Sequence, residues 1–394
     1  MKILQVNNVY GEKSTGVLTR LLHEGLQAAG EESLVIYGRG RGEQAPGVVQ
    51  LCPDWYGKMN SLLSRVTGLP YGGCRLSTLR LQRIILREKP DVVHLQCING
   101  NFVNIYHLVA WLKRKQIKTV VSLHAEFMYT GNCGHAYGCE QWKQGCKSCP
   151  NLREATRSWC LDHTAASWEK MRRAFAGFEK HSVLCPVSDW VARRAEQSQI
   201  VKKIPMRTVY NAVDGPFCFA ETVEKENAVL HVTAHFSPEN SHPKGGWYVL
   251  ELAKRMPEIT FYVAGKHEKV LNCPENVVFL GEITDRDALA AWYRRVKVTL
   301  VTSRAETFSM PCAESLCCGT PVVGFRAGGP EEIALPEYSA FVAFGAVDRL
   351  ETALRSWLNR SVEEKALAEK ARSVYSAETM VQQFLNVYRG LLWK

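Results

Sequence analysis

Two glutamates that lie eight residues apart mark the segment of this chain whose residue types could do chemistry. Glu306 follows the apolar run Val296–Val301, which is typical of a buried strand, and Glu314 lies within 310–318, where the pattern predicts a helix. Glu306 is therefore expected in the loop beyond the strand's carboxyl end, and Glu314 about one turn into the helix. Because a helix N-terminus presents unpaired amides, this loop suits phosphate or sugar hydroxyls.

Two further positions point to an anionic ligand. Lys244 precedes Gly245 and Gly246, which open a helix shortly after an apolar strand, and an ammonium beside a helix N-terminus suits a diphosphate leaving group. Gly16 ends a loop directly after the first expected strand, where glycine lets a ligand approach the backbone closely.

Polar residues at other segment ends are weaker candidates. His124 follows the apolar run Lys118–Leu123, at the strand end where open α/β sheets collect ligand groups, although a lone histidine there is often only a hydrogen-bonded structural residue. Ser188 and Asn211 lie in segments that are expected to face a binding site.

Four cysteines fall within a loop-like segment rich in glycine: Cys133, Cys139, Cys146 and Cys149. Four soft ligands suit a tetrahedral zinc ion that would staple a loop with few apolar residues. Reduced thiols are the main alternative to structural zinc, and a redox pair is a third.

Composition indicates an ordinary globular protein. The chain has 394 residues, of which 46% are hydrophobic and 22% are charged, enough for two domains. The first residues lack the long apolar core of a secretion signal and no membrane-spanning run is present, so we expect a cytoplasmic protein in which the fourteen cysteines form no disulfides.

Charge is distributed unevenly between the two halves. Residues 1–210 hold 29 Lys and Arg against 16 Asp and Glu, a net +13, whereas residues 211–394 hold 20 against 23, a net −3. The basic residues accompany amphipathic helices and no nucleic-acid module is recognisable, so an acidic membrane surface is the expected partner. Asp54–Thr67 would carry the apolar residues of such a surface on one face, unless that face covers the sheet.

Short apolar runs alternate with helical segments along the whole chain, which predicts an α/β fold with two doubly wound parallel sheets. The expected strands are 2–7, 33–37, 91–95, 118–123 and 183–187 in the first half, and 228–234, 259–264, 277–280, 296–301 and 321–325 in the second. A turn-forming stretch at 210–216 places the domain boundary after residue 210.

The segment from Glu306 to Glu314 resembles the sugar-nucleotide site of retaining glycosyltransferases of family four, of the kind that serve bacterial exopolysaccharide and colanic-acid synthesis. The resemblance implies the GT-B fold, in which two Rossmann-like domains face each other across a cleft. Residues 1–210 would form the acceptor-side domain, with a C-terminal helix at 376–394 packing back on it, and residues 211–375 would bind the nucleotide sugar.

The resemblance also implies a role for each site residue. Glu306 would contact the transferred sugar, with His124 at its border, and Glu314 would contact the ribose. Gly16 and Lys244 would bind the diphosphate, Asn211 would lie nearby, and the amides of Phe308, Ser309 and Met310 would bind sugar hydroxyls. Family members often have Gly-Phe-Gly where this chain has Thr307-Phe308-Ser309. The family's usual arginine before the lysine is missing, so the second cation is His235, Arg304 or absent.

These observations predict an enzyme that transfers a sugar from a UDP or GDP donor to an acceptor hydroxyl, with a lipid-linked glycan as the acceptor. No metal or cofactor is required for that step. The alternatives are a non-catalytic protein that binds nucleotide sugars, and a zinc-dependent deaminase, since His124-Ala125-Glu126 followed by Cys146-Lys-Ser-Cys149 imitates the motif of that class.

Overall fold

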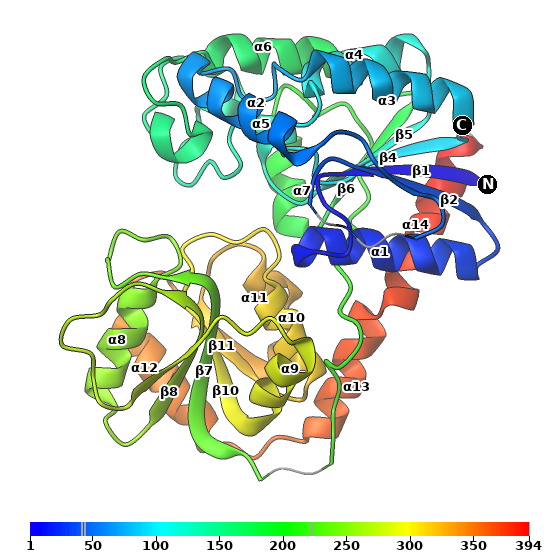
Figure 1. Cartoon of the computed structure of the whole chain (residues 1–394). Coiled ribbons are helices and arrows are strands. Elements are labelled where there is room, and N and C mark those ends of the chain that lie inside the picture. The colour runs from blue at the N-terminus through cyan, green and yellow to red at the C-terminus, as the bar shows by residue number, and fades with distance from the viewer. Residues whose placement is uncertain (41, 43–44, 222–223, 394) are drawn as a thin grey trace. The chain divides into compact units, whose positions relative to one another are not determined.

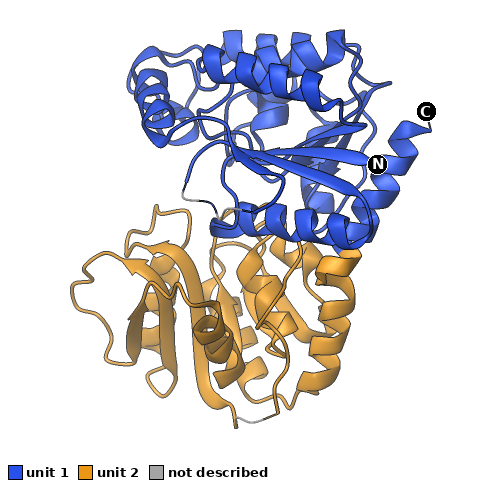
Figure 2. Ribbon diagram, turned by 45° about the vertical axis from the view of Figure 1, so that its right-hand side comes forward, with its two compact units in different colours: residues 1–210, 380–394 blue, residues 211–379 orange. Residues whose placement is uncertain are grey.

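The chain forms two compact units in the computed structural model, which describes residues 1–40, 42, 45–221 and 224–393. Unit 1 comprises Met1–Tyr210 and Met380–Lys394, and unit 2 comprises Asn211–Thr379 (Figure 2). The division falls after Tyr210, where the sequence places the linker. The return of the chain to unit 1 begins at Met380, four residues later than the sequence suggests.

Unit 1 is built on a parallel six-stranded sheet whose strand order is β3-β2-β1-β4-β5-β6. Its strands are rich in valine, isoleucine and leucine because helices cover both faces of the sheet. The strands are β1 (Lys2–Asn7), β2 (Glu32–Tyr37), β3 (Val48–Gln50), β4 (Val92–Leu95), β5 (Thr119–Leu123) and β6 (Ser182–Pro186).

Helices lie on both faces of this sheet (Figure 1). They are α1 (Lys13–Ala28), α2 (Asp54–Thr67), α3 (Arg75–Glu88), α4 (Ile105–Arg114), α5 (Phe127–Thr130), α6 (Thr164–Phe175) and α7 (Asp189–Glu196), with short helical turns at Gln141–Lys143 and Leu152–Thr156. The last helix, α14 (Ala377–Leu392), begins in unit 2 and ends in unit 1. There the Tyr388 hydroxyl lies 2.8 Å from Nδ1 of the buried His94 in β4, so the C-terminal helix completes the core of unit 1.

Unit 2 contains a second parallel six-stranded sheet, with the strand order β12-β11-β10-β7-β8-β9. Its strands are β7 (Glu226–Phe236), β8 (Thr260–His267), β9 (Val277–Gly281), β10 (Val296–Val301), β11 (Val322–Phe325) and β12 (Ser339–Val342). Its helices are α8 (Gly246–Arg255), α9 (Arg286–Arg295), α10 (Met310–Cys317), α11 (Pro330–Ile333), α12 (Val347–Leu358) and α13 (Glu364–Tyr375), with a helical turn at Pro336–Tyr338.

The hydrophobic core of unit 2 lies between its sheet and the pair α8 and α12. Leu252 of α8, Phe261 of β8 and Leu354 of α12 are fully buried there. Helices α9, α10 and α13 cover the other face (Figure 1). The predicted fold class is confirmed, since each unit is a parallel sheet with alternating helices. Among the described residues, no helix is long and apolar enough to cross a membrane.

Candidate functional site

The segment that joins β10 to α10 is a strand-turn-helix unit, as predicted. In its loop, the Glu306 amide donates to the Ala327 carbonyl and the Glu306 carbonyl accepts from the Gly329 amide, both at 2.9 Å. A Cβ at Gly329 would lie 2.5 Å from the Thr307 carbonyl oxygen, so only glycine allows the two loops to approach this closely. The loop that carries Glu306 is therefore fixed against the loop that follows β11.

Lys244 lies at the same end of this sheet, and its Nζ is 2.6 Å from Glu306 Oε1. The neighbouring Gly245 has a φ of 68°, and a Cβ there would lie 2.2 Å from the Thr302 carbonyl oxygen. The Thr302 hydroxyl also donates to the Lys244 carbonyl at 3.1 Å. The loop before α8 thus packs on the end of β10, and this packing places the ammonium beside the carboxylate.

Glu314 lies about one turn into α10, where it accepts a hydrogen bond of 3.1 Å from the Tyr293 hydroxyl. Burial raises the pKa of its carboxyl to about 7, although this hydrogen bond and the nearby charge of Arg286 lower the pKa. Arg286 is itself paired with Asp214. A carboxyl with this pKa exchanges its proton near neutral pH, which is unusual for a glutamate.

The loop Thr307-Phe308-Ser309 keeps the backbone of a glycine-containing turn. Ser309 has φ 79° and ψ 87°, in the region that favours glycine, directly before the first turn of α10. Phe308 is buried and packs edge-on against Tyr375 of α13. Met310 begins the helix and is followed by Pro311, which fits the first turn because it has no amide hydrogen to satisfy.

The two candidates for the second cation differ in their surroundings. His235 Nε2 lies 2.9 Å from Glu268 Oε1, so this imidazole already has a carboxylate partner. Arg304 is exposed, and its amide donates to the Pro243 carbonyl at 2.8 Å. The backbone of Arg304 is therefore adjacent to the loop of Lys244, which makes Arg304 the better-placed cation.

Gly16 and His124 belong to unit 1, and Asn211 is the first residue of unit 2. His124 Nε2 lies 3.0 Å from Gln96 Oε1 at the carboxyl ends of β5 and β4. Burial lowers the pKa of His124 to about 4, so its imidazole is neutral at physiological pH. Helix α1 begins at Lys13, so Gly16 lies in its first turn and not at the end of the loop as predicted, and its carbonyl accepts from the Gly11 amide at 3.0 Å.

The structure therefore groups Lys244 and Glu306, beside the start of α10 that leads to Glu314, at one edge of the unit 2 sheet. It places Gly16 and His124 at the corresponding edge of the unit 1 sheet. The predicted places of Lys244, Glu306 and His124 beside strand or helix ends agree with the structure, as does that of Glu314 within α10.

The loop of the four cysteines is anchored by Glu126, which is fully buried. Its carboxylate lies 2.6 Å from Arg194 Nε and 3.2 Å from His135 Nδ1, and it accepts a hydrogen bond of 2.7 Å from the Tyr129 hydroxyl. Burial alone would raise the pKa of Glu126, but His135, Arg194 and the Ala136 amide together lower it to about 2. No sequence signal indicated the central ion pair of this network, because Arg194 lies 68 residues from Glu126 in the chain.

The expected zinc site finds no support in the structure. Within the part of the chain that the structure describes, no three His, Cys, Asp or Glu side chains are grouped so that they could hold a metal ion. Cys133 is buried and Cys139, Cys146 and Cys149 are partly exposed, all as free thiols. Burial raises the pKa of the Cys146 thiol to about 12. Structural zinc stays a prediction to be tested by metal analysis.

The deaminase alternative is abandoned on two grounds. It requires a zinc ion held by His124, Cys146 and Cys149, and these residues form no such group. It also requires Glu126 to shuttle protons, whereas Glu126 is an ionised carboxylate tied to Arg194.

Comparisons with known proteins identify the family of the chain. Residues 15–215 match the family model described as Glycosyltransferase Family 4, and residues 224–374 match the model described as Glycosyl transferases group 1. The chain is 21% identical to the putative colanic acid biosynthesis glycosyl transferase WcaC of Escherichia coli K12, over 99% of this chain and 100% of that protein.

Two solved structures share the fold over nearly the whole chain. Sucrose-phosphate synthase from Thermosynechococcus elongatus is 14% identical, with a TM-score of 0.68 and 100% of both chains covered. Anabaena Alr3699/HepE in complex with UDP-glucose is 14% identical, with a TM-score of 0.62 over 99% of this chain and 100% of that chain. These likenesses confirm the predicted fold class.

Proposed function

The chain belongs to glycosyltransferase family 4, and from this premise we propose that it moves a sugar, with retention of configuration, from a nucleoside-diphosphate sugar to an acceptor hydroxyl of a lipid-linked glycan in surface polysaccharide synthesis. The observation that carries the proposal is the pair of Lys244 and Glu306 at the carboxyl edge of the unit 2 sheet, beside the start of α10. A cation, an acidic anchor and a helix N-terminus are the three groups that a sugar diphosphate needs.

Charge develops on the departing diphosphate as the glycosidic bond breaks, so the groups that bind this charge act mainly on the transition state. In this proposal Lys244 turns from Glu306 to the diphosphate, and Arg304 supplies the second positive charge. Glu306 then accepts hydrogen bonds from the sugar hydroxyls, and Glu314 accepts from the ribose. The amides of Phe308, Ser309 and Met310 complete the sugar contacts.

The unit 1 residues would act on the same substrate from the acceptor side. Gly16 leaves room for the diphosphate beside the first loop, and the neutral imidazole of His124 borders the sugar. Asn211 lies in the segment that joins the two units. With amides, Lys244 and Arg304 stabilising the leaving group, the transfer requires no divalent metal. The leaving phosphate takes the proton of the acceptor hydroxyl, as the family's proposed mechanism has it.

The relatives support the proposed donor and the proposed acceptor. UDP-glucose is bound by Alr3699/HepE, and WcaC carries the description of a colanic acid biosynthesis enzyme. The donor of this chain is therefore proposed to be a UDP or GDP sugar, and its acceptor a growing surface glycan.

Helix α2 supports association with an acidic membrane. The apolar residues of its face are exposed instead of covering the sheet: Trp55, Met59, Leu62, Leu63 and Val66. Exposed apolar side chains on a helix of a basic unit suit insertion among acidic lipid headgroups.

Transfer with retention is tested on the wild-type protein with a panel of nucleoside-diphosphate sugars and a lipid-linked acceptor. We expect one nucleoside diphosphate to raise the melting temperature, since a ligand at about 100 times its dissociation constant stabilises by roughly 2.7 kcal/mol. NMR of the product should show the anomeric configuration of the donor. Inversion, or no protection by any nucleoside diphosphate, would contradict the proposal.

Membrane association is tested by sedimentation with vesicles. The protein should sediment with phosphatidylglycerol vesicles and stay in solution with phosphatidylcholine vesicles. Leu62→Glu should weaken this binding because it places a carboxylate on the inserted face. Leu271→Glu in unit 2 is the matched control, since Leu271 is also exposed. Equal sedimentation of both variants would refute the role of α2.

A further inference from the structure

Unit 1 contains a cavity of about 400 Å³ that the proposed donor chemistry does not use. Segments from several parts of the unit line it, including the loop after β1, the end of α2, the loop after β4 and the stretch 154–157. A cavity of this size accommodates a small polar ligand.

Three arginines line the cavity: Arg39, Arg65 and Arg157. Glu154 is the single carboxylate among the described lining residues. Arg39 is held in place, since its Nε donates to Asn8 Oδ1 at 3.2 Å and its stem passes over Gly57 of α2, where a Cβ would lie 3.1 Å from Arg39 Cδ. Planar guanidinium groups match the oxygens of phosphate, so this lining favours a phosphorylated ligand.

Polar groups of the lining suit a sugar beside that phosphate. Asn99 and Asn101 carry amide donors and acceptors, and Tyr71 and Tyr137 carry aromatic rings. His135 lies at the wall and is held by Glu126, so the buried network under the cysteine loop also supports the cavity.

The backbone of the lining is strained in several places. Tyr71, Asn101, Tyr137 and Arg157 are non-glycine residues with φ values of 62°, 55°, 47° and 61°. Left-handed conformations of such residues cluster at functional sites, because the surrounding structure must hold them there. We therefore expect the surrounding structure of unit 1 to hold this cavity in a defined shape.

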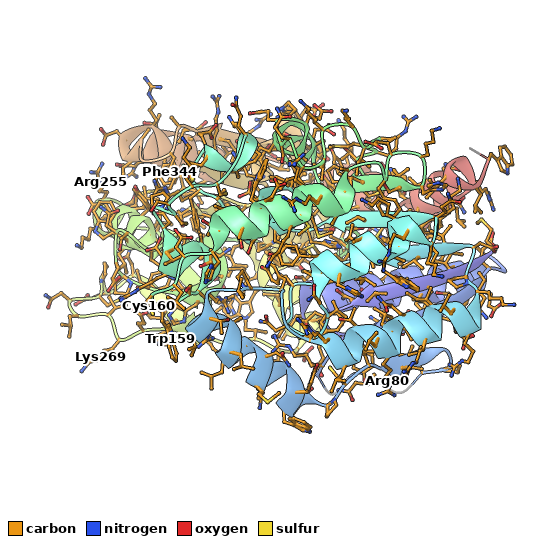
Figure 3. The ribbon with its side chains drawn as sticks, turned by 90° about the horizontal axis from the view of Figure 1, so that it is seen from above. Arg80, Trp159, Cys160, Arg255, Lys269 and Phe344 are labelled. Atoms are coloured by element: carbon orange, nitrogen blue, oxygen red, sulfur yellow. The ribbon has the colours of Figure 1, made fainter. Side chains whose placement is uncertain are left out.

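An apolar strip runs beside the cavity. Ser61, Ser64 and Arg65 of α2 line the cavity. The exposed apolar residues of α2 form the apolar strip, on the other side of the same helix. The segment after Arg157 contacts the end of α2, since the Trp159 amide donates to the Arg65 carbonyl at 2.9 Å. Trp159 is exposed beside the end of α2 (Figure 3).

We infer that this cavity binds the phosphate-linked sugar of the acceptor, with the phosphates on Arg39, Arg65 and Arg157 and the alkyl chain along the apolar strip of α2. A free sugar would bring no anion to the three guanidinium groups, and a bilayer surface alone would leave the cavity empty. A glycosyl lipid diphosphate satisfies the cavity and the strip together. The inference rests on the proposed function, because it names the acceptor that the transfer would use.

Binding is measured without any donor sugar, in saturating UDP so that the donor site is blocked, and with three probes: decyl diphosphoglucose, decyl glucoside and inorganic diphosphate. Decyl diphosphoglucose should bind at least about tenfold more tightly than decyl glucoside, because charge-assisted hydrogen bonds of this kind are worth a factor of ten or more. Inorganic diphosphate should bind weakly to the same arginines.

Variants locate the binding site. Arg65→Ala with Arg157→Ala should weaken decyl diphosphoglucose binding about 100-fold, and the corresponding lysine variants should recover part of that loss. Arg83→Ala removes an exposed arginine of α3 outside the cavity and should bind like the wild type. Trp55→Ala with Leu62→Ala should weaken binding of decyl diphosphoglucose and leave that of inorganic diphosphate unchanged.

Three outcomes would overturn the inference. They are equal affinity for the two decyl compounds, an equal loss of affinity in Arg83→Ala, or full affinity in Arg65→Ala with Arg157→Ala when this variant has the wild-type melting temperature. The proposed function fails separately, through absence of UDP binding or of sugar transfer in the wild-type protein.

Discussion

The two units have the same strand order, since β9-β8-β7-β10-β11-β12 repeats β3-β2-β1-β4-β5-β6 position by position. Each unit also has an ion pair formed by a glutamate that follows a strand. In unit 1 this pair is Glu126 with Arg194, whose side chains are 0% and 15% exposed. In unit 2 it is Glu306 with Lys244, which are 21% and 37% exposed.

This difference in exposure separates two uses of the same chemistry. A buried pair cannot exchange its partner for a ligand, because either charge left alone would remain without water. A partly exposed pair can open, since water and a ligand reach both groups at little cost. We therefore expect the unit 1 pair to hold the fold and the unit 2 pair to serve the transfer.

Breaking the buried pair should give the largest effect on stability. Arg194→Ala leaves Glu126 buried without its partner, so the free energy of unfolding should fall by about 3–5 kcal/mol in urea denaturation. Arg173→Ala is the control, because Arg173 pairs with Glu169 on the surface, where such pairs contribute about 1 kcal/mol or less. Similar losses in the two variants would erase the distinction.

Breaking the exposed pair should act on the reaction instead. Lys244→Ala should lower the transfer rate by about 10²–10³-fold, as loss of a group that stabilises transition-state charge does, with unfolding free energy changed by about 1 kcal/mol or less. Lys266→Ala removes the similarly paired Lys266, which lies 3.2 Å from Glu282, and should keep the wild-type rate. A large loss of stability in Lys244→Ala would assign this pair to the fold.

The buried Glu314 of unit 2 should make the free energy of unfolding depend on pH. Because its pKa in the folded state is raised to about 7, the folded protein binds this proton more tightly than the unfolded chain does. The stability that Glu314 contributes is thus present at pH 4 and is lost as the pH rises through about 7. Glu314→Gln should reduce the loss of unfolding free energy between pH 5 and pH 8 by roughly 1–3 kcal/mol. Glu282→Gln is the control, and an unchanged slope in Glu314→Gln would contradict the assignment.

Removing divalent metal should have the smallest effect. With Lys244, Arg304 and amides at the leaving group, transfer in excess EDTA is expected to proceed at the rate without EDTA. Loss of activity that Mg²⁺ or Mn²⁺ restores would refute this mechanism.

Metal analysis of the wild type against Cys146→Ser with Cys149→Ser decides the separate question of structural zinc, because a bound ion would be missing from the variant.

Local patterns predicted the fold and the unit 2 site because each of them is contained in a short stretch of chain. All ten expected strands are present, and the two that were missed are the short edge strands β3 and β12. Lys244 and Glu306 could be predicted since each lies beside a strand or helix end that the apolar pattern reveals.

The unit 1 features could not be predicted in the same way. Arg39, Arg65 and Arg157 meet in one cavity although they come from three separate segments, and no spacing in the sequence relates them. The same is true of Glu126 and Arg194. The cysteine pattern predicted structural zinc, which stays a prediction, since the described residues show no group of three metal ligands.

The course of helix α14 has a consequence for the order in which the protein is made. Tyr388 lies against His94, and Val381 packs on Gly25, so unit 1 needs residues that are synthesised after unit 2. Unit 2 has all of its residues before that point. The N-terminal half must therefore wait, with part of its core uncovered, until α14 has been synthesised, and a chain that stops before α14 would never close this core.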